Sequence, residues 1–280
     1  MKVFQEALYG DHGQTLSIDE VVFAGHTGHQ EALIFTNPVF GKVLALDGVV
    51  QLTELDNHVY HEMVAHVPAM AHGMPRDVLI IGGGDGGTLK EMLKHPVDSV
   101  VLVELDAEVI ALSRKFFPDV SGGAFGDRRV TVTIGDGAAY VENTGRQFDL
   151  IVIDSTDPVG PGEVLFSDRF YRSCRSALRP GGIVSLQSGT PFYHAARLER
   201  QLEALERCFG SARPFLAPVP TYAHGLLALI VAAQADVFCP PLDLLRARFG
   251  TLDTTYYAPE VHHAAFAAAP LCFTRSSAPR

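Results

Sequence analysis

The sequence predicts an α/β fold, in which a doubly wound, mostly parallel sheet follows a small N-terminal β-domain. From residue 77 onward, short apolar segments alternate with amphipathic segments. This alternation is typical of βαβ units, whose parallel strands are covered by helices on both faces. Before residue 54 the chain contains only short β-rich segments separated by turn residues. We therefore expect two domains, one of β-strands at residues 1–56 and a larger α/β domain at residues 57–280.

The N-terminal domain is expected to contain at least three strands. The segments EALIF, KVLAL and VVQLT have the composition of strands, and the dipeptides Asn37-Pro38 and Asp47-Gly48 separate them. Asp-Gly is a strong signal for a two-residue hairpin turn. In residues 57–73, apolar residues recur at helical spacing, which predicts a short amphipathic helix closed by Pro68 and Gly73.

The elements of the α/β domain follow in chain order. The strand and glycine turn VLIIGGGDGG precede the helix TLKEMLKH, and the strand SVVLVELD precedes the helix AEVIALSRKFF. Next come the strand VTVTIGD, the segment AAYVENT, the strand FDLIVID, the helix SDRFYRSCRSAL and the strand GGIVSLQS. After the helix ARLERQLEALERCFG, the segment LLALIVAAQ predicts another buried strand. In the tail we expect helices near residues 240–248 and 258–268.

A glycine turn and acidic residues mark the ends of four predicted strands. The turn IGGGDGG either is a generic connection or lets the backbone approach a nucleotide closely, as in Rossmann-like folds. The acids in this turn and at the next three strand ends are Asp85, Glu104, Asp136 and Asp154. Ligands of open α/β sheets bind outside the carboxyl ends of the strands. We therefore expect a ligand site that these acids share.

The position of Asp85 indicates which nucleoside the site prefers. The turn resembles that of enzymes that bind adenosyl-sulfonium compounds, and a carboxylate inside it would repel the α-carboxylate of S-adenosylmethionine. The same carboxylate would attract a tail that carries only an amine, as in decarboxylated S-adenosylmethionine. An S-adenosylmethionine-dependent methyltransferase remains the alternative, but it needs a group for the α-carboxylate, and no basic residue lies in or next to the turn.

Composition and charge argue against several classes of protein. The chain has 280 residues, 47% of them hydrophobic, and its 22 Lys and Arg against 32 Asp and Glu give a net charge of -10. An acidic chain repels phosphate backbones, so we expect no nucleic-acid partner. No apolar segment approaches a membrane span and no signal core begins the chain, so we expect no membrane partner and a cytoplasmic location. The order His61, Glu62, His66 does not match the H-E-x-x-H motif of metalloproteases, and we expect no metal.

Eight segments carry a resemblance to one enzyme family. They are HQEALIF, GKVLALDGVVQLTE, YHEM, IGGGDGG, VELD, GDG, DSTDPVGPGEVLF and PTY. In them the chain resembles the spermidine synthases, the polyamine aminopropyltransferases, over nearly its whole length. The resemblance implies a class I methyltransferase-like fold and a transferase that moves the aminopropyl group of decarboxylated S-adenosylmethionine to putrescine, giving spermidine and methylthioadenosine. It also implies a homodimer or a dimer of dimers and a co-substrate rather than a cofactor, with cadaverine, agmatine or spermidine as alternative acceptors.

The resemblance assigns roles to single residues. Asp154, Tyr60 and Asp157 would be catalytic, with Asp154 positioning the attacking amine and accepting its proton. Glu104 would bind the ribose hydroxyls and Asp136 the adenine. The residues implied for decarboxylated S-adenosylmethionine are Gln30, Gly82, Gly84, Asp85, Glu104, Asp136, Gly137 and Pro161. The residues implied for the polyamine are His61, Asp85, Asp154, Asp157, Gln187 and Tyr222.

Two features depart from the family, and both concern the far end of the amine pocket. The chain contains no Trp, and Phe4 stands roughly where the family often has one. In the stretch ELDN, Asn57 replaces a usual acid. The loop at residues 155–165 combines two prolines with two glycines, so we expect a mobile lid that closes over the bound amine.

Overall fold

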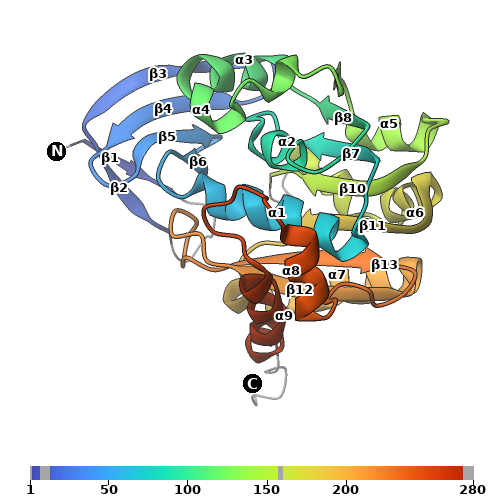
Figure 1. The fold of residues 1–280 in the computed structure, drawn as a ribbon. Coiled ribbons are helices and arrows are strands. Elements are labelled where there is room, and N and C mark those ends of the chain that lie inside the picture. Colours follow the sequence, from blue (N-terminus) through green and yellow to red (C-terminus); the bar gives the residue numbers. More distant parts are fainter. Residues whose placement is uncertain (1, 7–12, 157–159, 274–280) are drawn as a thin grey trace.

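The centre of the molecule is a seven-stranded sheet in the order β12-β13-β11-β10-β7-β8-β9 (Figure 1). The computed structural model describes residues 2–6, 13–156 and 160–273, without the side chains of residues 160, 161 and 270–273. The strands of this sheet are β7 (Asp77–Gly82), β8 (Ser99–Glu104), β9 (Val130–Ile134), β10 (Phe148–Asp154), β11 (Leu178–Gln187), β12 (Ser211–Ala217) and β13 (Leu227–Ala233). The predicted α/β class, with a mostly parallel sheet, is confirmed.

Two strands at one edge of this sheet differ from the prediction. The segment LLALIVAAQ forms β13, but it runs antiparallel to both β11 and β12. The sequence does not predict β12, because Arg213 and Pro214 interrupt its apolar pattern. Proline is tolerated in edge strands, where its missing N–H is not needed for a ladder bond, and β12 lies at the edge of the sheet.

Helices cover both faces of the sheet. On one face lie α1 (Asn57–His72), α2 (Gly87–Met92), α8 (Leu242–Phe249) and α9 (Pro259–Phe273). On the other face lie α5 (Gly137–Asn143), α6 (Asp168–Ala177) and α7 (Pro191–Phe209). Strand β7 supplies Val78 and Ile80 to the first core and Leu79 and Ile81 to the second. This two-sided burial is the reason that the strands are continuously apolar rather than alternating.

Helix α1 spans the predicted segment, but Pro68 does not close it. It passes through Pro68, and ends at Gly73, whose φ is 93°. A proline inside a helix costs about 3 kcal/mol. Every residue from Val59 to Ala71 is buried, so packing of the helix between the sheet and α2 outweighs this local penalty.

The N-terminal residues form two antiparallel sheets. The strands are β1 (Lys2–Gln5) and β2 (Thr15–Ile18) in one, and β3 (Glu20–His26), β4 (Glu31–Asn37), β5 (Gly41–Leu46) and β6 (Val49–Thr53) in the other. Asp47 and Gly48 both have positive φ, of 48° and 75°, as the predicted hairpin turn requires. The four-stranded sheet packs against α3 (Ala107–Phe116) and α4 (Pro118–Ser121). This contact fixes β4–β6 beside the carboxyl end of β8.

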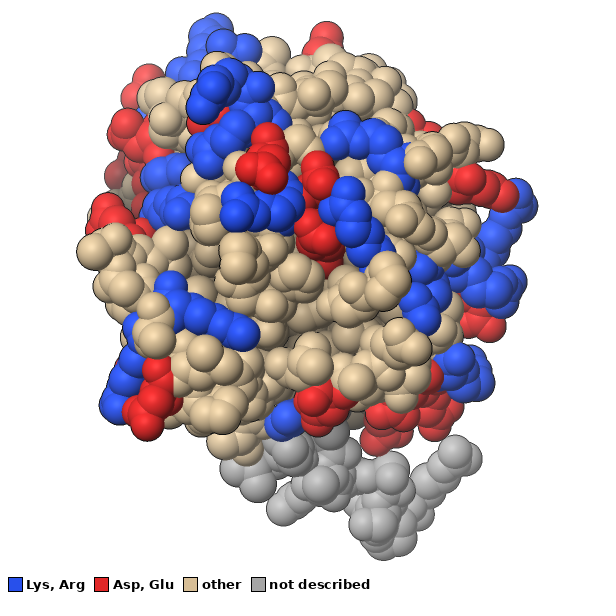
Figure 2. Space-filling view, turned by 45° about the vertical axis from the view of Figure 1, so that its right-hand side comes forward, with Lys and Arg blue, Asp and Glu red and all other residues tan. Residues whose placement is uncertain are grey.

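The surface carries mixed charge on the face shown in Figure 2. Lys and Arg side chains gather there with Asp and Glu side chains between them. Among the described residues, exposed ion pairs such as Arg246–Glu260, with an N–O distance of 2.8 Å, join charges of opposite sign. None of the described helices is both long enough and apolar enough to cross a membrane.

Candidate active site

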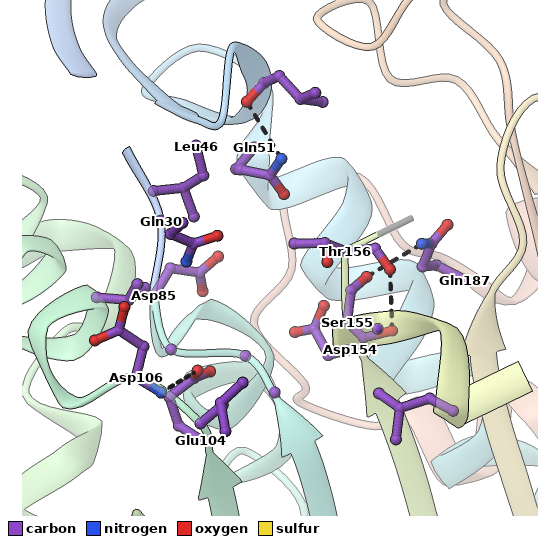
Figure 3. A pocket seen from close by; sticks show the side chains of 18 of the residues that line it. Gln30, Leu46, Gln51, Asp85, Glu104, Asp106, Asp154, Ser155, Thr156 and Gln187 are labelled. Carbon is purple, nitrogen blue, oxygen red and sulfur yellow. Dashed lines mark hydrogen bonds between the residues drawn. The ribbon is translucent and has the colours of Figure 1, made fainter. Parts of the chain in front are cut away.

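A cavity of about 530 Å³ lies at the carboxyl ends of the central strands. Strand β7 is flanked by β8 on one side and β10 on the other, so the chain changes direction along the sheet at this point. Such switch points are the usual ligand sites of open α/β sheets. Gln30, Leu46 and Gln51 reach the cavity from the N-terminal strands and turns, and Asp154 and Gln187 lie across from Glu104 and Asp106 (Figure 3).

The glycine turn brings β7 and β10 into direct contact. Gly82 has a φ of 81°, and a Cβ at this position would lie 2.1 Å from the backbone oxygen of Asp154. The N–H of Gly83 donates to the same oxygen at 2.8 Å. A Cβ at Gly84 would lie 2.9 Å from the Glu104 carboxylate. Glycine is therefore needed at these positions for the turn to approach Asp154 and Glu104 closely. As a result, Asp85, Glu104 and Asp154 all line the same cavity.

Asp154 is held by two hydroxyl groups. Tyr60 Oη donates to its Oδ1 at 2.6 Å, and Thr88 Oγ1 donates to its Oδ2 at 2.6 Å. Burial, and then the negative charge of Asp85, raise the pKa of Asp154 although both hydrogen bonds oppose the shift. Burial and the Asp154 carboxylate raise the pKa of Tyr60, which therefore remains a donor. The arrangement fixes the orientation of a carboxylate that binds protons more strongly than usual.

Asp85 is paired with His61. Its Oδ1 accepts from the N–H of Gly87 at 2.7 Å, and its Oδ2 lies 3.2 Å from His61 Nε2. Burial works to raise the pKa of Asp85, but the charge and hydrogen bond of His61, with the Gly87 N–H, outweigh burial and lower it. Asp85 is therefore an ionised group inside the turn.

Glu104 and Asp136 lie at the ends of neighbouring strands. Burial, with the charges of Asp106 and Asp154, raises the pKa of Glu104 to about 7, although Glu104 Oε1 accepts from the N–H of Asp106 at 3.0 Å. Asp136 caps α5, since its Oδ1 accepts from the N–H groups of Ala138 and Ala139. The other carboxylate oxygen of Glu104 faces Gly84, where a Cβ would lie 2.9 Å from it.

The other end of the cavity is built by long-range contacts. Gln187 Nε2 donates to the backbone oxygen of Ser155 at 3.1 Å, and Tyr222 Oη donates to the backbone oxygen of Gln51 at 2.8 Å. Asp56, buried at the start of α1, accepts from Thr53 Oγ1 at 2.7 Å, and from both the N–H and the hydroxyl of Thr221. This carboxylate fixes the segment that carries Tyr222 against the N-terminal sheet.

The structure brings together most of the residues that the sequence singles out. The predicted residues that line the cavity are Gln30, Tyr60, Gly82, Gly84, Asp85, Glu104, Asp136, Gly137, Asp154, Gln187 and Tyr222. His61 does not line it, but lies behind Asp85. Asp157 lies outside the described residues, as does the side chain of Pro161 in the 3-10 turn η2 (Gly160–Phe166). Their predicted roles, and the predicted lid, therefore stay predictions.

The two departures from the family pattern lie outside the main cavity. Phe4 is buried and packs on Phe35, with ring centroids 5.3 Å apart. The side-chain amide of Asn57 donates to the backbone oxygens of Thr53 and Glu54. Both side chains therefore support the surrounding structure.

Sequence reasoning does not find Thr88, Gln51 or Asp56. Thr88 directly follows the glycine turn, and a hydroxyl at the start of the helix after β7 is the signal that could have indicated it. Gln51 and Asp56 have no comparable local signal, because their roles depend on Thr221 and Tyr222.

Two family models match the chain. The spermidine synthase tetramerisation domain matches residues 3–54, and the spermine/spermidine synthase domain matches residues 57–239. A polyamine aminopropyltransferase of Pseudomonas syringae pv. tomato is 44% identical over 271 residues, which are 95% of this chain and 95% of that protein. A polyamine aminopropyltransferase of Ruegeria sp. is 46% identical over 266 residues, with 94% of each chain covered.

Solved structures give the same similarity. A spermidine synthase in complex with the transition state analogue AdoDATO superposes with a TM-score of 0.88 and 38% identity, over 95% of this chain and 92% of that chain. Spermidine synthase from Thermotoga maritima gives a TM-score of 0.85 and 36% identity, over 95% of this chain and 90% of that chain.

Proposed function

The chain belongs to the spermidine synthase family, and from this premise we propose that it transfers the aminopropyl group of decarboxylated S-adenosylmethionine to putrescine. It is a polyamine aminopropyltransferase, and its products are spermidine and methylthioadenosine. The identity of the acceptor as putrescine is the more specific part of this proposal. Decarboxylated S-adenosylmethionine acts as a co-substrate, and the reaction uses no resident cofactor.

One observation supports decarboxylated S-adenosylmethionine over its parent. None of the described residues that line the cavity is Lys or Arg, whereas Asp85, Glu104, Asp136 and Asp154 all line it. A substrate with an α-carboxylate would find no positive partner there, and Asp85 would repel it. A substrate with a free ammonium group would pair with Asp85. This charge distribution argues against a methyltransferase that uses S-adenosylmethionine.

The reaction is an in-line displacement, in which the nitrogen of a primary amine forms a bond to the methylene carbon beside the sulfonium and the carbon–sulfur bond breaks. The sulfonium is a good leaving group, so the protein has to orient the reactants and supply a neutral amine. An alkylamine resembles Lys, with a pKa of about 10.4, so removing its proton at a pH of about 7.4 costs roughly 4 kcal/mol.

Asp154 is suited to accept the proton of the amine. Because its pKa is raised, the difference between the pKa of Asp154 and that of the amine is smaller than for an ordinary carboxylate. The hydroxyls of Tyr60 and Thr88 fix the orientation of Asp154. Asp157, Gln187 and Tyr222 would hold the rest of the polyamine, while Gln30, Glu104, Asp136 and Gly137 would hold the nucleoside. Gly82, Gly84 and Pro161 would lie against it.

The test is product identity. The protein is incubated with putrescine and either decarboxylated S-adenosylmethionine or S-adenosylmethionine, and the products are identified by mass. We expect methylthioadenosine and spermidine from the decarboxylated compound alone. Formation of S-adenosylhomocysteine without methylthioadenosine would contradict the proposal. Parallel reactions with cadaverine, agmatine and spermidine rank the acceptors. A faster reaction with one of these amines would identify it, rather than putrescine, as the preferred acceptor.

We further propose that residues 1–56 form an assembly domain and residues 57–280 the Rossmann-like catalytic domain. The match of residues 3–54 to a tetramerisation domain supports an oligomer, either a homodimer or a dimer of dimers. Light scattering at micromolar concentration should give the mass of two or four chains. A single-chain mass would show that the proposed assembly is wrong.

The predicted lid gives an expected result for hydrogen exchange. Closure of residues 155–165 over a bound amine would shield the reacting carbon from water. Backbone amides of this segment should therefore exchange more slowly when methylthioadenosine and spermidine are both bound. Equal exchange with and without this pair would identify the segment as a fixed wall.

A further inference from the structure

The imidazole of His61 is enclosed behind Asp85. Its side chain is 4% exposed, and its Nε2 lies 3.2 Å from Asp85 Oδ2. The ring packs on the backbone of Gly87, where a Cβ would lie 2.2 Å from Nδ1. It also meets the Tyr60 ring edge-on, with centroids 5.5 Å apart. His61 is therefore fixed in place as the partner of Asp85.

The charged groups that act most strongly on His61 are acidic. Asp85 faces it from the glycine turn, Asp154 from β10 and Glu91 from α2, while Tyr60 is its neutral neighbour on α1. Burial opposes a charged imidazole, but the three carboxylates, Asp85 foremost, outweigh burial and raise the pKa of His61. No Lys or Arg among the described residues lines the cavity in front of Asp85. His61 is thus placed to balance the charge of Asp85.

We propose that His61 carries a proton opposite Asp85 until an ammonium group of the ligand reaches Asp85, and that it then releases this proton. The inference rests on the proposed function, because it needs a ligand with an ammonium group. Two unit charges about 5 Å apart, at an effective dielectric constant of about 20, repel strongly enough to change a protonation equilibrium by about 300-fold. The arriving ammonium therefore replaces the imidazolium as the counter-ion of Asp85.

A small cavity beside His61 has room for a water molecule. This second cavity has a volume of about 10 Å³ and is lined by His61 together with Asn57, Tyr60 and Tyr222. That volume is about what one water molecule needs. In the proposed step an N–H bond of the imidazolium breaks, its electron pair stays on the ring, and the proton passes to water and then to the buffer.

The consequence is that binding of the ammonium competes with protonation of His61. As pH falls below the pKa of His61, affinity for the cationic substrate should fall, because more of the imidazole must lose a proton before the ammonium can bind. Methylthioadenosine has neither the ammonium nor the sulfonium, so its binding should not depend on His61. A merely structural role for His61 would change the affinity for both ligands alike.

Calorimetry measures this proton directly. Binding is titrated in Asp154→Asn, which removes the second titrating carboxylate beside Asp85, and without an amine acceptor, so that no turnover occurs. The observed enthalpy in several buffers at one pH near 6.5, plotted against the ionisation enthalpy of the buffer, gives the number of protons released. We expect decarboxylated S-adenosylmethionine to release more protons than methylthioadenosine, by up to one per site. Subtracting the value for methylthioadenosine from that for the decarboxylated substrate removes the contribution of any proton released by Glu104.

The matched variant is Asp154→Asn with His61→Gln. Gln keeps a hydrogen-bonding group beside Asp85 but cannot be protonated, so the difference between the two ligands should fall to near zero. Unchanged methylthioadenosine affinity shows that the variant is folded, and His61→Asn replaces it if that affinity is lost. An undiminished difference without His61 would overturn the inference. If the decarboxylated substrate does not bind at all, the proposed function itself is wrong.

Discussion

Asp154→Asn should lower kcat by about 10²–10⁴-fold, the usual cost of losing a general base. The amide cannot accept the proton of the attacking amine, although it can still contact Tyr60 and Thr88. Initial rates at saturating substrate, measured by methylthioadenosine formation, give the effect. Affinity for methylthioadenosine should stay within a few-fold of the original value. Unchanged kcat would remove Asp154 from the mechanism.

Asp154→Asn should lower kcat without lowering the stability of the folded protein. Burial and the charge of Asp85 disfavour the ionised form of Asp154 in the folded protein. The neutral amide avoids that cost, so the melting temperature should be equal or higher. Asp149→Asn is the matched control at the other end of β10, where the carboxylate accepts from the N–H groups of Arg76 and Asp77. It should lower the melting temperature and leave kcat unchanged.

Glu104→Gln should weaken methylthioadenosine binding by about 10–100-fold, since each hydrogen bond to a charged group contributes about 1.5–3 kcal/mol. The amide has one acceptor oxygen and no charge, so it cannot receive both ribose hydroxyls as a carboxylate does. Titration calorimetry gives the dissociation constant. Glu108→Gln is the matched control, because Glu108 is exposed on the first turn of α3. Equal affinities in both variants would contradict the role of Glu104.

The pH dependence of this binding follows from the same carboxyl group. The pKa of Glu104 is raised to about 7, so the group gains a proton as pH falls through neutrality. The protonated form is a poorer acceptor, and methylthioadenosine affinity should therefore decline below a pH of about 7. Glu104→Gln should flatten this profile. The variant should also be more stable above that pH, where the folded protein carries the unfavourable buried charge.

Sequence patterns correctly predict the elements that are determined by local sequence. Alternating segments give the parallel strands, and acids at successive strand ends must meet because those ends share one edge of the sheet. Strand β12 is not predicted, because Arg213 and Pro214 interrupt its apolar pattern. The antiparallel direction of β13 is not encoded in its own residues, since it depends on which strands lie beside it. The passage of α1 through Pro68 is decided by packing on both sides of the helix.

The same distinction holds within the site. Asp85, Glu104 and Asp154 each follow a recognisable strand, so position alone indicates them. Asp56 is recognised only through Thr221, which lies 165 residues further along the chain. His61 is found as a binding candidate from its motif, but its place behind Asp85 depends on how α1 packs against the glycine turn.

The contact of Asp56 with Thr221 also divides the site into two parts with separate origins in the chain. The end proposed to hold the nucleoside is built from strand ends between Gly82 and Asp154. The end proposed to hold the amine depends on the contact of residues 51–57 with residues 219–223. Under the proposed roles, substitutions in these two short segments can therefore change the preferred amine during evolution, while the glycine turn stays the same. Relatives that differ in acceptor would then be expected to differ most in these segments.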